Sequence, residues 1–171
     1  MPADNPCLAP ELVAEASKVG AALKAKKLSI VTAESCTAGL LAAILAQVEG
    51  ASDFLHGAFV TYTKEQKILA AGVPADLLKT FGSVNEAVAV ALAEGALTRS
   101  KADIGVGITG VLGPKPDEDG NPVGRVFLAC APRNGVTRSL KREYGERHHE
   151  WIRRQVIRDA CGLVCESIAT L

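Results

Sequence analysis

Apolar residues recur every three or four positions along five stretches of this 171-residue chain, which is the period of an amphipathic α-helix. This pattern predicts helices over 8–27, 35–48, 64–71, 83–96 and 152–171. The first of these ends in basic residues, which suit the dipole at the carboxyl end of a helix. The fourth opens at Ser83 with the S-x-x-E form of a capping box.

β-Branched and aromatic residues mark the stretches between these helices, which is typical of strands. Strands are predicted over 28–33, 54–61, 103–109, 123–131 and 136–144. The last two flank Arg133-Asn134-Gly135, and Asn-Gly favours the tight turn of a hairpin. Strands that alternate with helices and then end in a hairpin predict an α/β fold, a layered sandwich with a mixed β-sheet flanked by helices.

Ser35 stands where the first strand ends and the second helix is expected to begin, and its hydroxyl allows two interpretations. In the first, Ser35 only caps that helix, a role for which serine is favoured. In the second, it is a nucleophile that attacks a carbonyl, while free N–H groups of the first turn receive the developing oxyanion. The pattern alone favours the cap.

Two features of the third strand suggest a binding site. Gly105 and Gly107 share one of its faces, which predicts the close approach of a helix or a ligand. The strand leads into residues 110–122, which are long for a loop in a compact domain. Open α/β sheets bind ligands where such loops leave the strands. The loop is therefore either part of a site or an ordinary surface excursion.

Charge and composition exclude several classes of function. The chain has 19 basic and 19 acidic side chains, so it offers no global positive field to hold nucleic acid. No apolar run approaches the roughly 20 residues of a membrane span, and the first residues do not resemble a signal peptide. We expect a single domain over residues 1–171, located in the cytoplasm, with neither nucleic acid nor a membrane as a partner.

The five cysteines and three histidines do not have the spacing of a metal site. An odd number of cysteines without a CxxC pair indicates reduced thiols. Cys161 and Cys165 fit the apolar stripe of the last helix as small buried residues. His148 and His149 are neighbours, and neighbouring helix residues point about 100° apart. We therefore predict no metal ligands and a surface position for the two histidines.

A serine nucleophile needs a base, because its hydroxyl is barely ionised near neutral pH. Histidine is scarce, and His56 lies inside a predicted strand, where a structural role is commoner than catalysis. The end of that strand offers Tyr62 and Lys67 instead. A lysine buried beside Ser35 would lose its charge by desolvation and act as base, and a tyrosine hydroxyl can relay a proton to a leaving group. Spacing alone favours a solvated position instead, because charged residues after a strand are usually solvated.

Several separated motifs, in order along the chain, resemble one known family. They are Ala33-Glu34-Ser35-Cys36-Thr37-Ala38-Gly39-Leu40, similar to A-E-S-C-T-G-G-x; Val60-Thr61-Tyr62-Thr63-Lys64-Glu65-Gln66-Lys67, similar to v-x-Y-S-N-E-x-K; Thr109-Gly110-Val111-Leu112-Gly113-Pro114 and Pro122-Val123-Gly124, similar to T-G-x-x-G-P and P-V-G; and Gly145-Glu146-Arg147 leading to Ile152-Arg153, similar to G-D-R…I-R. The family is the CinA C-terminal domain, which includes the nicotinamide mononucleotide deamidases. The resemblance covers nearly the whole chain and implies a stand-alone, single-domain form.

This resemblance implies an amidohydrolase that converts nicotinamide mononucleotide to nicotinic acid mononucleotide and ammonia, with no metal or organic cofactor. Ser35 is then the nucleophile, Lys67 its base and Tyr62 a proton donor to the departing ammonia. The implied substrate-binding residues are Cys36, Thr37, Thr109, Gly110, Arg147 and Arg153. Among these, the Cys36 and Thr37 amides receive the oxyanion, and Arg147 pairs with the phosphate of the small-molecule nucleotide.

Three departures from the family pattern mark this chain: Ala38 replaces a glycine, Lys64 replaces an asparagine, and the acidic segment 115–120 replaces a glycine-rich one. A Ser/Tyr/Lys set like that of short-chain dehydrogenases is excluded, because Tyr62 and Lys67 are five positions apart rather than four and no G-x-G-x-x-G follows the first strand. A catalytically silent module that only binds a nucleotide or a partner stays open, as does a homo-oligomer.

Overall fold

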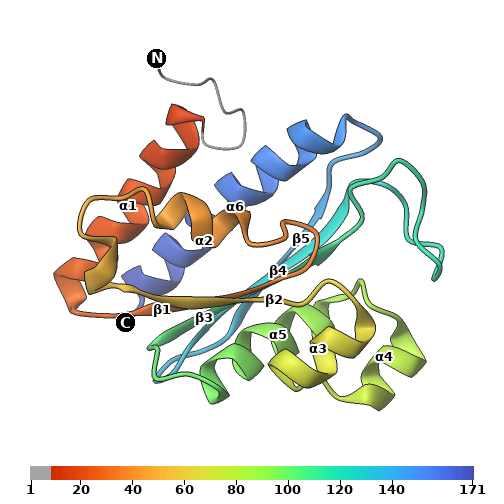
Figure 1. Cartoon of the computed structure of the whole chain (residues 1–171), viewed down its shortest axis with the longest axis horizontal. Coiled ribbons are helices and arrows are strands. Elements are labelled where there is room, and N and C mark those ends of the chain that lie inside the picture. Colours follow the sequence, from red (N-terminus) through yellow and green to blue (C-terminus); the bar gives the residue numbers. More distant parts are fainter. Residues whose placement is uncertain (1–8) are drawn as a thin grey trace.

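A mixed five-stranded β-sheet runs through the centre of the computed structural model, which describes residues 9–171 (Figure 1). The strands are β1 Ile30–Glu34, β2 Leu55–Val60, β3 Ile104–Gly110, β4 Arg125–Pro132 and β5 Arg138–Glu143. Their order across the sheet is β2-β1-β3-β4-β5. The first three in this order are parallel, and β4 and β5 are antiparallel to their neighbours. The predicted hairpin is thus β4–β5.

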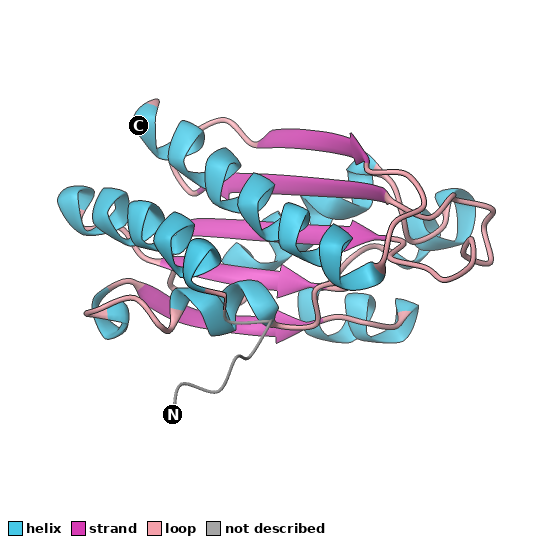
Figure 2. Ribbon diagram, turned by 90° about the horizontal axis from the view of Figure 1, so that it is seen from above, coloured by secondary structure: helices cyan, strands magenta, loops and turns pink. Residues whose placement is uncertain are grey.

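Helices cover both faces of the sheet, so the molecule has three layers (Figure 1 and Figure 2). One face carries α1 Pro10–Lys26, α2 Leu40–Leu45 and α6 His149–Ala169; the other carries α3 Lys64–Ala71, α4 Ala75–Phe81 and α5 Glu86–Thr98. A short 3₁₀ helix, Ala51–Asp53, precedes β2. Each face packs its own apolar cluster, the larger one under α1 and α6 and the smaller one under α5. The predicted layered α/β sandwich with a mixed sheet is confirmed.

Helix α5 lies so close to β3 that glycine is required between them. A Cβ atom built on Gly107 would lie 2.1 Å from the carbonyl oxygen of Ala89, and one on Gly105 would lie 2.2 Å from that of Ala93. A side chain at either position would therefore push the helix away from the sheet. The close approach that the two glycines predict is that of a helix.

Several helix boundaries differ from the sequence prediction. The N-cap of α5 is Asn85 rather than Ser83, because the Asn85 side chain accepts a hydrogen bond from the Val88 N–H at 2.9 Å. The short helix α4, which has Pro74 as its N-cap, has no counterpart in the prediction. The last helix begins at His149, before the predicted start at Ile152.

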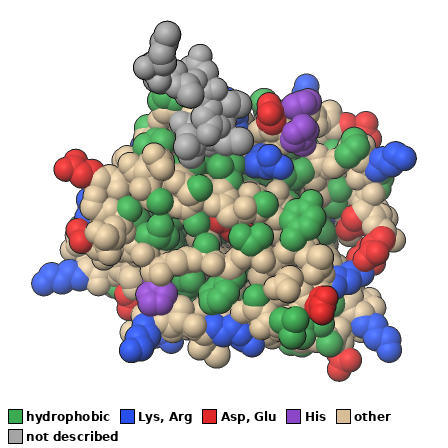
Figure 3. All heavy atoms as spheres, viewed as in Figure 1, with side chains coloured by type: hydrophobic (Ala, Val, Ile, Leu, Met, Phe, Trp, Pro, Cys, Tyr) green, Lys and Arg blue, Asp and Glu red, His purple; other side chains and the backbone are tan. Residues whose placement is uncertain are grey.

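Residues 1–8 lie outside the described part of the chain, and with them Cys7 and the predicted helix start at Leu8. Within residues 9–171, no helix is both long and apolar enough to cross a membrane. The four cysteines of this part are free thiols. On the face shown in Figure 3, basic and acidic side chains are interspersed around the edge, in line with the formal net charge of zero.

Candidate active site

Ser35 directly follows β1, the strand that has a parallel neighbour on each side. The Ser35 N–H donates to the carbonyl of Ile108 in β3 at 3.0 Å, and the carbonyl of Glu34 accepts from the N–H of Thr61, just after β2, at 2.7 Å. The backbone is therefore held from both sides. This is the carboxyl edge of the parallel strands, where open α/β sheets bind ligands.

The chain does not enter a helix at Ser35. Residues 36–39 form turns, and α2 begins only at Leu40 with Gly39 as its N-cap. Ala38 and Gly39 both adopt positive φ, 52° and 90°. Glycine accepts this conformation freely, whereas Ala38, which replaces a family glycine, is strained there. The interpretation of Ser35 as the N-cap of a helix over 35–48 is wrong.

Glu34 supplies the capping that Ser35 does not. Its carboxylate accepts hydrogen bonds from the N–H groups of Gly39, Leu41 and Ala42 and from the hydroxyl of Thr32, all at 3.0–3.1 Å. The Glu34 side chain is fully buried, and a buried carboxylate is tolerated only when its oxygens are satisfied in this way. These bonds fix the turn that carries Ser35 and leave the serine hydroxyl free for another contact.

Lys67 reaches Ser35 from helix α3. Its Nζ lies 2.9 Å from Ser35 Oγ, 2.8 Å from the carbonyl oxygen of Thr61 and 3.3 Å from that of Tyr62. The Lys67 side chain is only 1% exposed. Burial lowers the pKa of Lys67 from the ordinary 10.5 to about 8, because the charged amine is poorly solvated there. The predicted pairing of a buried, readily deprotonated lysine with Ser35 is present in the structure.

The turn after Ser35 carries two available N–H groups. Those of Cys36 and Thr37 donate no hydrogen bond to any residue of the described part of the chain. The thiol of Cys36 is a rival nucleophile by position, but burial, together with the Glu34 carboxylate, raises its pKa to about 12. The thiol therefore stays protonated at neutral pH, which argues against Cys36 as a nucleophile.

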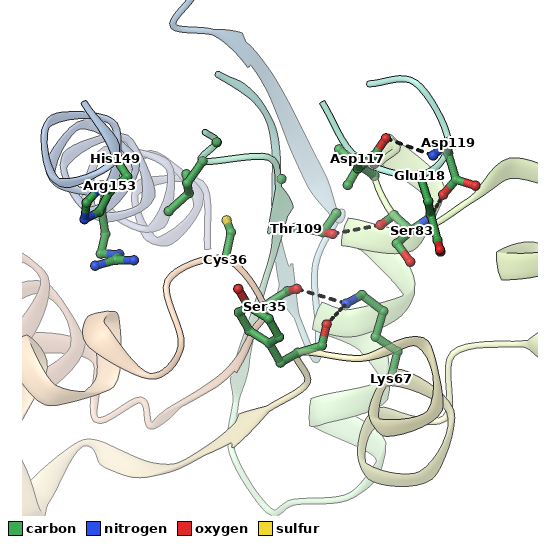
Figure 4. A pocket seen from close by; sticks show the side chains of 15 residues that line it. Ser35, Cys36, Lys67, Ser83, Thr109, Asp117, Glu118, Asp119, His149 and Arg153 are labelled. Atoms are coloured by element: carbon green, nitrogen blue, oxygen red, sulfur yellow. Dashed lines mark hydrogen bonds between the residues drawn. The ribbon is translucent and has the colours of Figure 1, made fainter. Parts of the chain in front are cut away.

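A pocket of about 460 Å³ opens over Ser35 and Lys67 (Figure 4). The predicted site residues that line it are Ser35, Cys36, Tyr62, Lys67, Thr109, Gly110 and Arg153. They come from the carboxyl ends of all three parallel strands and from α3 and α6. The structure thus brings together all of the predicted residues except Thr37 and Arg147.

Arg147 does not reach the pocket, in contrast to the prediction. It is exposed, and its guanidinium carbon lies 5.8 Å from the centre of the Trp151 ring, a cation–π contact. Thr37 is buried and lines a smaller neighbouring cavity together with Arg153, which borders both cavities. The local motif could not show which of two nearby arginines faces inward.

Tyr62 and Thr109 line the pocket in different ways. The Tyr62 side chain is 68% exposed, and its backbone carbonyl, not its hydroxyl, contacts Lys67. The Thr109 side chain is buried, and its hydroxyl donates to the carbonyl of Ser83 at 2.7 Å. Ser83 also lines the pocket, so the hydroxyl of Thr109 joins two walls of the site.

An acidic wall was missed by the sequence reasoning. Asp117, Glu118 and Asp119 line the pocket, which makes the loop after β3 part of the site rather than a surface excursion. Lys64 forms ion pairs with Glu118 and, at 3.5 Å, with Asp119. The N–H of Ser83 donates to Asp119 at 3.3 Å. Two departures from the family pattern, Lys64 and the acidic segment, are therefore in contact, and their opposite charges were the available signal.

The three histidines lie on the surface, and one of them borders the pocket. His149, at the start of α6, lines the pocket near Arg153 (Figure 4), which the sequence did not indicate. His148 and His149 are both exposed, as predicted, and so is His56 on β2. Within residues 9–171, no group of three His, Cys, Asp or Glu side chains is arranged to hold a metal ion.

Known proteins resemble this chain in sequence and in fold. A putative competence-damage inducible protein of Desulforamulus reducens is 45% identical over 129 residues, which are 75% of this chain and 31% of that protein. The nicotinamide-nucleotide amidohydrolase PncC of Escherichia coli K12 is 39% identical over 147 residues, 85% of this chain and 87% of that protein. A crystal structure of the competence/damage inducible protein CihA from Agrobacterium tumefaciens matches with a TM-score of 0.87 at 35% identity, over 91% of this chain and 94% of that one.

The extent of these matches differs between relatives. The chain spans 31% and 27% of the length of two competence-damage inducible relatives, those of Desulforamulus reducens and Symbiobacterium thermophilum, against 87% of the E. coli protein. The family match itself is to the CinA C-terminal domain and runs over residues 13–168, so it includes every residue of the pocket described above. The chain therefore belongs to the CinA C-terminal domain family.

Proposed function

We propose that this chain hydrolyses the carboxamide of nicotinamide mononucleotide to give nicotinic acid mononucleotide and ammonia. The observation that carries the proposal is the 2.9 Å contact between Lys67 Nζ and Ser35 Oγ on the floor of the pocket, because a buried amine beside a hydroxyl is a base next to its nucleophile. The similarity to the E. coli protein named as a nicotinamide-nucleotide amidohydrolase supports the substrate.

The three contacts of Lys67 favour its action as a base. The carbonyl oxygens of Thr61 and Tyr62 can only accept hydrogen bonds. A neutral amine has two hydrogens, and these two carbonyls engage both of them. The lone pair is then directed at the Ser35 hydroxyl, which is the geometry needed to remove its proton.

The reaction proceeds in two steps in this proposal. The Ser35 oxygen attacks the carboxamide carbon while its proton passes to Lys67, and the free N–H groups of Cys36 and Thr37 bind the oxyanion. The C–N bond then breaks, and the nitrogen leaves as ammonia after taking up a proton. Lys67 gives up the proton that it received, to the leaving nitrogen or to solvent, and is neutral again. Water attacks the resulting ester with Lys67 again as base, which releases the carboxylic acid and restores the Ser35 hydroxyl.

Tyr62 has a supporting role in this scheme. Its side chain lines the open side of the pocket, so its hydroxyl can deliver a proton to the departing ammonia and take one back from solvent. Lys67, protonated in the first half-reaction, is the alternative donor. An unchanged kcat in a Tyr62→Phe variant would remove this role from Tyr62.

The remaining wall of the pocket binds the nucleotide in this proposal. Gly110 and the backbone around Thr109 border the space above Ser35. Arg153 is the arginine that lines the pocket, whereas Arg147 is exposed beside Trp151 and does not line it. No metal or organic cofactor takes part in the scheme, since Lys67 supplies the base.

The alternative is a module that binds a nucleotide without chemistry. The complete set of Ser35, Lys67 and free turn amides argues against it, because a binding site gains nothing from a buried lysine with a lowered pKa. The binding-only module is kept as an alternative because the wider family contains relatives named only as competence-damage inducible proteins.

One experiment separates the two functions. The purified chain is incubated with nicotinamide mononucleotide, and ammonia and nicotinic acid mononucleotide are measured together. We expect the two products in equal amounts, and a Ser35→Ala variant serves as the control for background hydrolysis. Binding of nicotinamide mononucleotide without either product would support the silent module instead.

A further inference from the structure

The two edge strands of the sheet differ in how they are protected. Strand β5 forms one edge, and four of its six residues are charged: Arg138, Lys141, Arg142 and Glu143. Strand β2 forms the other edge, and its sequence Leu-His-Gly-Ala-Phe-Val contains no lysine, arginine, acidic residue or proline. Charges and proline normally keep the unpaired backbone of an edge strand from pairing with another chain. The β2 edge lacks this protection.

The backbone of β2 directs hydrogen-bonding groups away from the sheet. In the described part of the chain, β2 pairs with β1 alone. The N–H of Thr61 donates to the last residue of β1. Because the backbone groups of a strand alternate in direction, the N–H and C=O groups of Val60 and Ala58 point to the free edge. The bulge in β2 falls at His56, and the rest of the strand pairs with β1 in regular register.

The surface around this edge is poor in charge. The view of Figure 1 and Figure 3 looks onto the β2 edge; charged side chains lie mostly at the periphery of that face, and apolar side chains gather near its centre. The side chains of Ala58 and Val60 are exposed, that of Val60 by 49%. Helix α3, which contacts β2, also exposes Leu69 by 64%. An apolar centre with a charged rim is typical of a protein–protein interface.

The sequence of β2 fits a second copy of itself. When two identical antiparallel strands are related by a two-fold axis, one residue lies opposite its own counterpart. With Ala58 in this place, the outward N–H and C=O groups of the two alanines bond to each other. Gly57 then lies opposite Phe59, and a Cβ atom built on Gly57 meets no atom within 4 Å. An aromatic ring beside an edge glycine is a favourable pair, and here it has the space that it needs.

We propose that β2 pairs with β2 of a second copy of this chain, antiparallel and centred on Ala58, so that the two sheets become one. A two-fold contact uses the same surface on both copies, so the assembly closes as a dimer. Strand β2 leads directly to Thr61 and Tyr62, whose carbonyls hold Lys67. Each pocket therefore lies next to the interface, although it is built from one chain. The dimer does not rest on the proposed function.

The first test measures the mass of the purified chain in solution, by sedimentation velocity over a range of concentrations. Ala58→Lys places two like charges directly opposite each other, and Val60→Lys adds a charge at the end of the paired segment. The matched control is Val136→Lys, the same change at a side chain that is 82% exposed and lies outside the strands. Thermal unfolding shows that each variant is folded.

We expect the wild type to form a dimer whose Kd rises by about 100-fold in Ala58→Lys and by about tenfold in Val60→Lys. Val136→Lys should dimerise like the wild type. A folded Val60→Lys protein decides the matter if Ala58→Lys does not fold, because the lysine at position 60 acts on the same edge.

A cross-link tests the register. In a hydrogen-bonded antiparallel pair, the two Cα atoms lie about 5.5 Å apart, which is within the range of a disulfide. Ala58→Cys should therefore give a covalent dimer on mild oxidation. In Val60→Cys the two introduced thiols belong to residues about 13 Å apart, so this variant should remain uncross-linked, as should the wild type with its native thiols.

Three results would overturn the proposal. A wild type that stays monomeric at every concentration would leave the edge to a strand of another protein. A dimer that neither lysine variant weakens would have its interface on a different surface. A dimer that is cross-linked in Val60→Cys but not in Ala58→Cys would have a different register.

Discussion

The floor and the rim of the pocket are built in opposite ways. On the floor, Lys67 and Glu34 are buried, and each is held by three or four hydrogen bonds to neighbouring groups. At the rim, Lys64 meets Glu118 and Asp119 in ion pairs open to solvent, with the Lys64 side chain 39% and the Glu118 side chain 72% exposed.

This difference in burial determines what each set of charges can do. On the floor, weak solvation changes the pKa of Lys67 and makes every hydrogen bond to Glu34 costly to lose. At the rim, water and salt screen the ion pairs, and such pairs contribute about 0–1 kcal/mol each. The floor should therefore control chemistry and stability, and the rim should adjust only substrate binding.

Lys67→Arg should produce the largest effect. Arginine retains the charge, but it cannot accept a proton near neutral pH. We expect ammonia release from nicotinamide mononucleotide to fall by about a thousandfold or more. The matched control is Lys64→Arg on the same helix, which should remain near wild type. If a folded Lys67→Arg protein turned over normally, Lys67 would be structural.

Activity should also depend on pH through Lys67. Only the neutral amine accepts the Ser35 proton, and its pKa is about 8. The value of kcat/KM should therefore rise with pH and level off above an apparent pKa of about 8, with a roughly tenfold change per pH unit below it. A flat profile between about pH 6 and about pH 9 would exclude a base with this pKa.

The same burial links stability to pH. Lys67 has a pKa of 10.5 when unfolded and about 8 when folded, so between these values the unfolded chain binds more protons. Lys67 should therefore add about 3 kcal/mol to the free energy of unfolding across this range. Urea titrations at several pH values should show that Lys67→Met lacks this part of the rise. Identical pH dependence in both proteins would contradict the lowered pKa.

Glu34→Gln tests the other buried group of the floor. An amide keeps one accepting oxygen, but its NH2 group faces donors that the carboxylate now satisfies. We expect the free energy of unfolding to fall by about 2–4 kcal/mol in urea titration. The control is Glu94→Gln, an exposed carboxylate that accepts one hydrogen bond from Thr137. Equal losses of the free energy of unfolding in the two variants would contradict a particular contribution of the buried Glu34 carboxylate to stability.

The smallest effect is expected at the rim. Lys64→Glu places three like charges together and should raise KM by about two- to fivefold at low ionic strength. Adding Glu118→Lys restores opposite charges and should recover most of the loss. High salt should reduce both effects, as steady-state kinetics at two ionic strengths would show. A loss of kcat comparable with that of Lys67→Arg would contradict the distinction between floor and rim.

Local patterns predicted the fold well, because the periods of apolar residues reflect which face of each element is buried. They could not by themselves select Ser35 and Lys67, which the resemblance to the family identified. They failed where a distant or unexpected group took over a local role. Serine is a favoured N-cap residue, yet the buried carboxylate of Glu34, and not the Ser35 hydroxyl, accepts hydrogen bonds from the N–H groups at the start of α2.

The rest of the site depends on contacts that spacing does not encode. The loop after β3 reaches the pocket because Lys64 and the Ser83 N–H hold its carboxylates. The choice between Arg147 and Arg153 depends on where α6 begins: Arg147 precedes the helix and is exposed, whereas Arg153 lies on the helix and lines the pocket.

The Ser35→Ala variant tests the central claim most directly. Its release of ammonia from nicotinamide mononucleotide is measured, and its binding of the same compound is measured by calorimetry. The account needs the hydroxyl of Ser35 for chemistry and not for the fold, since within residues 9–171 this hydroxyl forms a hydrogen bond only with Lys67. The account predicts binding close to that of the wild type and a loss of ammonia release of about a thousandfold or more. Turnover near the wild-type rate in this variant would contradict it.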